Sequence, residues 1–364
     1  MPVPTSTAPP PLFPTLTRSE ADAARTSAWY DTFEDLTTPA TVINIDALDE
    51  RAAFLEWIES DSIFIPEDAG AEPSDEDAPK YHLPALNKAI RAAIDKYGAV
   101  FPKLNWTSPR DAAFILPQGH GPLHSTSPHD IYLLLKSSDF VQHDLDPISA
   151  YEGVSPADIP SEVSIELVLK KFTEMNPSQE VRCFVRDDIL LGITQRDTNF
   201  YEHYQGADEQ AALVSRVREF YEDEICENYA GGPNYVFDLY LADSGRITVT
   251  DFQPYRGSTD PLLFSYEELT ELLASARASP STSDEAEAGA ERLPELRVID
   301  SRAHPAANTG PAFGANMLPV EAVQMSEGQT ASDFALAWQE AMAQGMGRRM
   351  DELSDDEPDL EGMD

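Results

Sequence analysis

The sequence predicts an α+β protein whose strands pair mainly as antiparallel hairpins, rather than a doubly wound parallel sheet. In the first half of the chain, segments with apolar residues at helical spacing separate the predicted strands. In the second half, turn residues join the strands into two pairs. With 364 residues, of which 41% are hydrophobic, the chain is long enough for two packed lobes.

The first half of the chain alternates helical and extended patterns. Residues 83–97 repeat apolar side chains at helical spacing, and Gly98 is placed to end that helix. Residues 99–104 follow as a strand. A helix begins at Ser127-Pro128, with proline in its first turn. Residues 164–172 alternate as a further strand.

The second half is predicted as two hairpins and two helices. A strand at 180–185 pairs with one at 189–194, and strands at 235–241 and 247–252 pair around Asp243-Ser244-Gly245. Residues 209–229 form the helix between the hairpins. Ser265 and Glu268 form a capping box that opens the last helix, which runs to about Ala276.

Composition divides the chain into ordered and unstructured segments. The predicted lobes are residues 28–165 and 166–277, followed by C-terminal elements that pack on the core at 294–345. We expect disorder or flexibility in four segments that are rich in proline or acidic residues: a lead at 1–27, an acidic loop at 66–80, an acidic insertion at 278–293 and an acidic tail at 346–364.

The formal charge of −40 excludes general nucleic-acid binding and docking on anionic membranes, and it favours a basic protein partner. No apolar run approaches 18 residues, so we expect no membrane span. Cys183 and Cys226 cannot form a disulfide framework or a four-ligand zinc site, and they are typical of a reduced, cytoplasmic protein.

The second hairpin carries the strongest chemical signal. With Ser244-Gly245 as a two-residue loop, Asp238 lies directly opposite Asp251, and Gln253 shares the face of Asp251. Two facing carboxylates repel each other, and a hard divalent cation such as Mg²⁺ removes that repulsion. The alternative is that the acids face solvent, and a glycine-containing bulge would shift the register by one residue and spoil the alignment.

Basic residues within apolar strands point to an anion beside this patch. In a chain poor in cations, the candidates are Lys103, Lys170, Lys171, Arg182 and Arg196. Buried charges are costly unless they are paired, so a polyphosphate is one explanation. Internal ion pairs, such as Arg182 with Glu180 or Arg196 with Asp197, are the other.

No known catalytic signature is present. The chain lacks the P-loop and G-x-G-x-x-G patterns. No Ser-His-Asp or Cys-His arrangement can be proposed, so we assign no catalytic residue.

Seven segments in order resemble the cell division cycle protein 123 family, the assembly chaperones of eukaryotic translation initiation factor 2. The resemblance covers about residues 29–273, with a weaker match at 315–319. Its segments begin at Phe101, Leu133, Leu167, Glu180, Gly192, Val236 and Asp251. The most specific are Phe101-Pro-Lys-Leu-Asn-Trp106 and Gly192-Ile-Thr-Gln-Arg-Asp197.

The resemblance implies a two-lobed, ATP-grasp-like fold that binds ATP and Mg²⁺. It places Lys103 and Lys170 at the phosphates, Lys171 and Phe172 near the adenine, and Glu180, Arg182 and Arg196 along the cleft. Asp238, Asp251 and Gln253 would hold Mg²⁺, although the family has Asn at the position of Gln253. The acidic insertions also depart from the family pattern.

For function, the resemblance implies binding of the γ subunit of initiation factor 2 and promotion of its joining to the α subunit, by a chain that is monomeric when free. Transfer chemistry is not implied. Two alternatives are an ATP-grasp ligase or kinase acting on a carboxylate or protein substrate, and an acidic scaffold for basic proteins.

Overall fold

The computed structural model describes residues 10–60, 64–69, 80–116, 123–278 and 293–306. Its strands are β1 (Ala40–Asn44), β2 (Val100–Leu104), β3 (Glu166–Lys171), β4 (Glu180–Arg186), β5 (Ile189–Gln195), β6 (Tyr235–Leu241), β7 (Ile247–Pro254) and β8 (Glu295–Arg297). They form a three-stranded sheet in the order β1-β3-β2 and a five-stranded sheet in the order β7-β6-β4-β5-β8. All pairs are antiparallel except β5 with β8, so the α+β prediction is confirmed.

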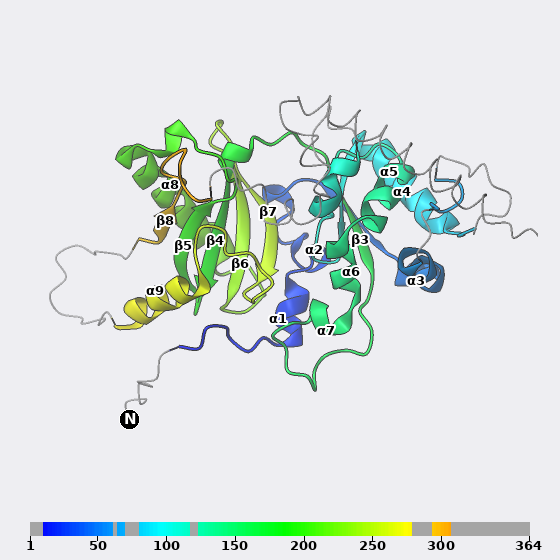
Figure 1. Cartoon of the computed structure of the whole chain (residues 1–364), viewed down its shortest axis with the longest axis horizontal. Helices are drawn as coiled ribbons and strands as arrows, with labels where there is room; N and C mark the ends of the chain where they lie inside the picture. The colour runs from blue at the N-terminus through cyan, green and yellow to red at the C-terminus, as the bar shows by residue number, and fades with distance from the viewer. Residues whose placement is uncertain (1–9, 61–63, 70–79, 117–122, 279–292, 307–364) are drawn as a thin grey trace, which may run out of the picture.

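The helices lie around these two sheets (Figure 1). They are α1 (Arg18–Ala23), α2 (Thr26–Trp29), α3 (Arg51–Glu59), α4 (Pro84–Tyr97), α5 (Pro128–Lys136), α6 (Asp139–Leu145), α7 (Pro147–Ala150), α8 (Ala207–Phe220) and α9 (Tyr266–Ala278). Short 3-10 turns include η3 (Arg110–Ile115), and a π-helical turn, η7 (Tyr221–Ile225), continues α8. Within the described ranges, no helix is long and apolar enough to cross a membrane.

Several predicted helix ends are set by the expected chemistry. Gly98 ends α4 with a φ of 82°, a conformation that costs glycine little. Ser127 caps α5 through a capping box with Asp130. Ser265 and Glu268 exchange hydrogen bonds of 3.2 and 2.7 Å at the start of α9. The predicted helix at 209–229 instead begins at Ala207 and changes to π geometry at Tyr221.

The smaller sheet packs its helices on one face. Leu167 and Leu169 of β3 point toward a core that includes Leu86 and Ile90 of α4. Because side chains alternate along a strand, Val168 and Lys170 point to the opposite face. The predicted lobe boundary at residue 166 is therefore wrong, because β3 is the central strand of the smaller sheet and pairs with β1 and β2.

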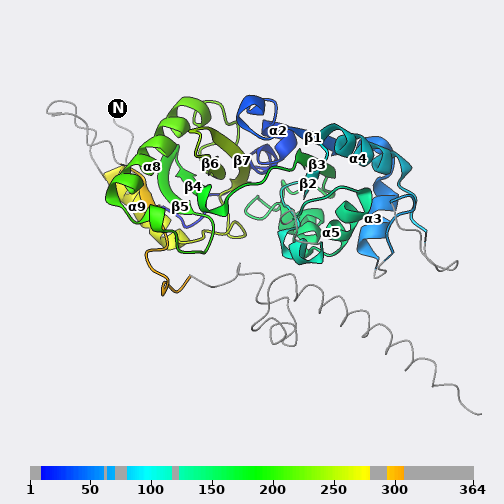
Figure 2. The same ribbon diagram turned by 90° about the horizontal axis from the view of Figure 1, so that it is seen from above.

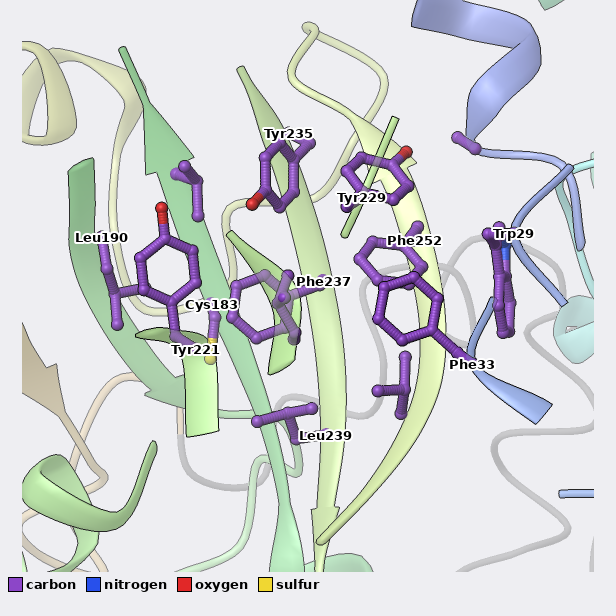
Figure 3. Close-up of a cluster of buried hydrophobic side chains, with 14 of the residues drawn as sticks. Trp29, Phe33, Cys183, Leu190, Tyr221, Tyr229, Tyr235, Phe237, Leu239 and Phe252 are labelled. Carbon is purple, nitrogen blue, oxygen red and sulfur yellow. The ribbon is translucent and has the colours of Figure 1, made fainter. Parts of the chain in front are cut away.

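The larger sheet has a core on each face. One face packs against α8 and η7 and also receives Trp29 and Phe33 from the N-terminal segment (Figure 3). Phe252 of β7 lies at the centre of this aromatic group, with its ring stacked on Tyr229 at a centroid distance of 4.0 Å. The other face packs Phe184 and Val236 against α9.

The prediction of disorder across residues 1–27 is wrong for the part that the structure describes. Thr17 caps α1 through a capping box with Glu20, and Ala21 and Ala24 are fully buried. Trp106 donates a 2.7 Å hydrogen bond to the carbonyl of Ala21. The prediction was made from the proline and threonine content. It failed because the apolar partners of this segment are distant in sequence, so no local pattern reveals them. In Figure 1, α1 and α2 lie between the two sheets, and Figure 2 shows α2 in the same place from above.

The acidic segments fall mostly outside the described residues. This applies to 70–79, 279–292 and 307–364, and therefore to the predicted tail and most of the predicted C-terminal elements. At the start of the predicted loop at 66–80, Ala69 is buried, and its carbonyl accepts a 3.1 Å hydrogen bond from the His129 amide. That part of the loop is therefore fixed against α5 rather than solvated. β8 is added in parallel at the edge of the larger sheet.

Candidate functional site

Asp238 of β6 and Asp251 of β7 are direct partners in the larger sheet, as the sequence predicts. Gln253 lies two residues beyond Asp251 on the same face, opposite Val236. Asp238 is only 1% exposed, so the alternative in which both acids face solvent is wrong. Two oxygen-bearing acids therefore meet on one face of the sheet, on the side that carries α9.

Asp238 pairs with Asp251 as predicted, but the turn that leads to this register differs from the predicted one. The turn has three residues, Asp243-Ser244-Gly245, because the amide of Ala242 bonds to the carbonyl of Arg246 and Gly245 adopts a φ of 89°. A bulge then inserts Thr250, since Leu239 pairs with Val249 while Asp238 pairs with Asp251. The longer turn and the bulge each move the register by one residue, and they cancel at Asp238.

Two guanidinium groups hold Asp238. Arg182 donates from Nε and Nη2 to the two carboxylate oxygens at 2.8 and 2.9 Å, and Arg196 Nε lies 3.0 Å from Oδ2. Burial would raise the pKa of Asp238, but Arg182, Arg196 and Arg110 outweigh it and keep that pKa below its ordinary value. Burial likewise opposes the charge of Arg182, but Asp238 raises the pKa of its guanidinium.

The ion pairs differ from those considered as the sequence alternative. Arg182 pairs with Asp238 rather than with Glu180. Arg196 pairs with Glu180 at 2.9 Å and with Asp238, rather than with Asp197. Internal pairing is therefore real. Arg182 pairs across β4 and β6, where it and Asp238 are register partners, and Arg196 pairs with acids of both strands from just beyond the end of β5.

Two lysines of the smaller sheet reach across to β7. Lys103 of β2 and Lys170 of β3 lie on the sheet face turned away from the helices, and both are at least 95% buried. Lys103 Nζ pairs with the Asp251 carboxylate. Lys170 Nζ donates a 2.6 Å hydrogen bond to the carbonyl of Thr250, the bulge residue. The alternation of two strands thus brings two cations onto the acidic patch.

Lys170 is in an unfavourable place for a positive charge. The pKa of its ammonium group is lowered to about 7, mainly by burial and also by Lys103 and Arg110, while Asp251 and Asp238 oppose the change. Its Nζ also lies 4.9 Å from the centre of the Trp29 ring, which offers a cation–π contact. Removal from water, rather than the neighbouring charges, is therefore the main reason that a positive charge on Lys170 is disfavoured.

The remaining predicted residues lie at the edges of this cluster. Lys171 is exposed at the end of β3, and the Phe172 ring meets His124 edge to face at 4.7 Å. Glu180 is half-buried and joins the cluster through Arg196. Lys170 and Lys171 are neighbours in the sequence, but alternation along β3 directs their side chains to opposite faces of the smaller sheet.

Arg110, the first residue of η3, was not selected from the sequence, although it belongs to the Phe101–Asp111 segment. It is solvent-accessible, yet protein surrounds it closely enough that desolvation lowers the pKa of its guanidinium to about 10. Arg196 and Arg182 lower that pKa, while Glu180 and Asp238 raise it. Its place in the same segment as Lys103 was the available signal.

The chemistry of the cluster suits a polyphosphate with a divalent cation. Five cations surround three carboxylates, and Asp260 adds a fourth acid through its influence on Arg182. Two carboxylates and an amide oxygen are donors of the kind that Mg²⁺ prefers. Among the described residues, however, no group of three or more His, Cys, Asp and Glu side chains is arranged to hold a metal.

Residues 29–326 match the family model described as D123. Curated relatives include the translation initiation factor eIF2 assembly protein of Schizosaccharomyces pombe, 33% identical over 89% of this chain and 97% of that protein. Cell division cycle protein 123 of Yarrowia lipolytica is 34% identical over 68% of this chain and 67% of its own length.

The structure is also similar to a solved relative. C-terminally truncated Cdc123 from Schizosaccharomyces pombe aligns with a TM-score of 0.59 and 31% identity, covering 79% of this chain and 99% of that one. These similarities span both sheets and most of the chain, so the likeness is to a whole protein and not to one motif.

Proposed function

This chain belongs to the D123 family, and on that basis we propose that it takes part in assembly of translation initiation factor 2 and binds ATP with Mg²⁺ while doing so. The assembly role is supported by the names of relatives that align over nearly their full length. For the partner within the factor, we propose the γ subunit, whose joining to the α subunit this chain would promote. The free cysteines agree with a cytoplasmic location.

The observation that carries nucleotide binding is the meeting of two sheets around unlike charges. Lys103 and Lys170 come from the smaller sheet, and Asp238 and Asp251 come from the larger one. Neighbouring cations exceed the acids that pair with them, which favours a multivalent anion at this position. A triphosphate fits because it presents several charged oxygens to cations on different strands.

The proposed roles follow the positions of the side chains. Lys103, Lys170, Arg182 and Arg196 would contact phosphate oxygens, with Glu180 holding Arg196 in place. Lys171 and Phe172 would lie near the base, beyond the phosphates. Asp238, Asp251 and Gln253 would hold Mg²⁺, which supplies positive charge to the two facing carboxylates and to the phosphates.

Gln253 would hold the metal less tightly than the shorter Asn found in the family. Its amide oxygen is the same kind of ligand, but the extra methylene moves it farther from the strand. Replacing Gln253 with Asn should therefore preserve or tighten Mg-ATP binding.

Calorimetric titration with Mg-ATP tests the nucleotide proposal. Wild-type protein should bind, and Asp251→Asn should bind at least about tenfold more weakly, since a charged ligand is lost while the strand pairing remains. Asp95→Asn, on the exposed face of α4, is the matched control and should bind as wild type. Equal affinity for Mg-ATP in all three proteins would show that Asp251 does not take part in binding.

Co-precipitation with separately purified γ subunit tests the assembly proposal. The full chain should retain the γ subunit and should increase recovery of a γ–α complex when the α subunit is added. A full chain that binds neither subunit would end the proposal. ADP release that depends on an added carboxylate or protein substrate would instead identify a ligase or kinase.

A further inference from the structure

Trp29, the last residue of α2, lies beside one of the proposed phosphate-binding lysines. The Lys170 Nζ lies over the Trp29 ring, 4.9 Å from its centre, which is within the range of a cation–π contact. Both side chains are buried, with exposed fractions of 2% for Trp29 and 5% for Lys170. Because little water reaches this place, the contact is stronger than the same pair would be at the protein surface.

The chain fixes Trp29 against the smaller sheet through the next residue. The hydroxyl of Tyr30 accepts a 3.0 Å hydrogen bond from the amide of Ala40, the first residue of β1. Ala40 is the register partner of Lys170 in β3. The residue after Trp29 is thus tied to the strand position directly beside Lys170, so the place of the ring follows from the backbone pairing.

The Trp29 ring is also held from the side of the larger sheet. It meets the ring of Phe252 in β7 edge to face at a centroid distance of 5.3 Å, and it meets Phe33 in the same way at 6.4 Å (Figure 3). Close packing of this kind leaves the indole little freedom to rotate away from Lys170. Trp29 therefore contacts both sheets at the point where a lysine of the smaller sheet reaches the larger one.

The contacts of Lys170 occupy two of the three N–H donors of its ammonium group. One N–H donates to the carbonyl of Thr250 at 2.6 Å, and the face of the Trp29 ring covers a second direction. In the part of the chain that the structure describes, Nζ makes no other hydrogen bond. One donor therefore remains for a ligand, and the carbonyl and the ring together set its direction because the ammonium is tetrahedral.

Phe33 offers a comparison within the same aromatic group. It also comes from the N-terminal segment, is 1% exposed and packs against Phe252 at a centroid distance of 5.2 Å. Among the contacts of the described residues, however, Phe33 has none with Lys170. The two rings therefore allow packing against Phe252 to be separated from contact with the lysine.

We propose that Trp29 is a positioning residue of the nucleotide site, which holds the Lys170 ammonium with one N–H directed at a phosphate oxygen. The assignment rests on the proposed function, in which Lys170 contacts the phosphates. Trp29 does not touch the nucleotide itself. Its ring acts through Lys170, because it fixes the direction of the ammonium and replaces part of the favourable interaction with water that burial removes.

A double-mutant cycle read by calorimetric titration with Mg-ATP tests the assignment. Trp29→Leu should weaken binding by about 5- to 30-fold, because a misdirected ammonium loses much of its charge-assisted contact. In a Lys170→Met background, the same Trp29→Leu change should alter the affinity by less than about twofold, since the group on which Trp29 acts is gone. An equal loss of affinity in the two backgrounds would show that Trp29 acts by packing alone and would overturn the assignment.

Two further variants separate the contact with Lys170 from packing. Trp29→Phe keeps an aromatic face and should bind Mg-ATP within about threefold of wild type. Phe33→Leu removes a ring from the same aromatic group, so it should lower the thermal unfolding temperature as Trp29→Leu does but leave the affinity for Mg-ATP unchanged. If Phe33→Leu weakens Mg-ATP binding as much as Trp29→Leu, packing explains the loss and the assignment fails.

Proton NMR without nucleotide supplies a readout that a packing role would not move. The ε-methylene protons of Lys170 should resonate upfield of those of exposed lysines, because they lie over an aromatic ring, and Lys170→Met identifies their signal. The upfield position should be lost in Trp29→Leu and kept in Phe33→Leu. A Lys170 signal at the position of exposed lysines in wild type would mean that the ring does not hold the ammonium, which overturns the assignment.

Failure of the assignment and failure of the proposed function give different results. If wild type binds Mg-ATP but the cycle shows no coupling between Trp29 and Lys170, the assignment alone is wrong. If wild type binds no Mg-ATP, the proposed nucleotide site is wrong, and the positioning role is wrong with it.

Discussion

Asp238 is held by two guanidinium groups whose positive charges compensate for its burial. Arg182 contacts both oxygens, and Arg196 approaches one of them. A buried ion pair gains little over apolar packing, but breaking it leaves an uncompensated charge in the interior. The same carboxylate that we propose as a metal ligand therefore also keeps the sheet together.

Replacing Asp238 with Ala should destabilise the fold as well as weaken nucleotide binding. We expect the free energy of unfolding to fall by about 3–5 kcal/mol, because buried Arg182 loses its acid and half-buried Arg196 keeps only Glu180. Urea denaturation followed by circular dichroism measures the change. Asp223→Ala, at an exposed site on η7, should stay within about 0.5 kcal/mol of wild type. A stable Asp238→Ala protein would show that water or another acid compensates Arg182.

Lys170 should make ATP binding depend on pH. Its pKa is about 7 in the folded chain against 10.5 ordinarily, so between these values the unfolded chain binds more protons and stability rises with pH. A phosphate beside Lys170 favours its charged form and raises that pKa, so binding near pH 8 should take up a proton.

Calorimetry at pH 8 in two buffers of different ionisation enthalpy measures this proton uptake. Wild type should take up a substantial fraction of one proton, and Lys170→Met should take up much less. Proton release, or equal uptake by both proteins, would exclude Lys170 as the group that responds to the phosphate.

At the scale of elements, short polar contacts decide where the site residues stand. The Thr250 bulge keeps Asp251 opposite Asp238 and presents a carbonyl to Lys170. Asp111 ties η3 to the start of α6 and thereby fixes the backbone beside Arg110. Such contacts involve few atoms, yet each fixes the backbone beside a charged residue.

Asp111→Ala should loosen η3 and lower stability by about 1–3 kcal/mol. The substitution removes three acceptor contacts, to the Ser138 hydroxyl and to the amides of Asp139 and Phe140. Chemical denaturation measures the loss, with Asp95→Ala on exposed α4 as the control. If stability is unchanged, the start of α6 is capped well enough by Ser138 alone.

At the scale of the whole molecule, the N-terminal segment joins the two sheets. The Trp29 ring packs against Phe252 at 5.3 Å and lies beside Lys170 of the smaller sheet. Arg25 donates to the hydroxyl of Ser164 at 2.8 Å, and Thr37 donates to the carbonyl of Val249 at 2.7 Å. Of these residues only Arg25 belongs to the segment that was predicted to be disordered, whereas Trp29 and Thr37 lie in the part that was expected to be ordered.

Removing residues 1–27 should destabilise the protein, whereas removing residues 1–9 should not. The longer truncation exposes the surface that Leu16, Ala21 and Ala24 cover, at a cost of about 3 kcal/mol or more. Differential scanning calorimetry compares the two shortened chains with the full one. Equal unfolding temperatures for all three would mean that α1 contributes no net stability.

Local patterns determined much of the architecture. Helical spacing with capping residues located α4, α5 and α9, because a capping box or a terminal glycine acts within a few residues. Alternation and turn residues located both hairpins, and they placed Asp238 opposite Asp251. That pairing was reached through a loop one residue too short, which the unpredicted bulge at Thr250 offset.

The sequence by itself determined the elements, the hairpins and the two facing acids, because each depends on neighbours along the chain. Only the tertiary structure decided that β3 belongs with β1 and β2, that Ala21 of α1 is buried, and that Lys103 and Lys170 reach β7. Those arrangements depend on which apolar faces fit together across more than a hundred residues, and no local pattern records that choice.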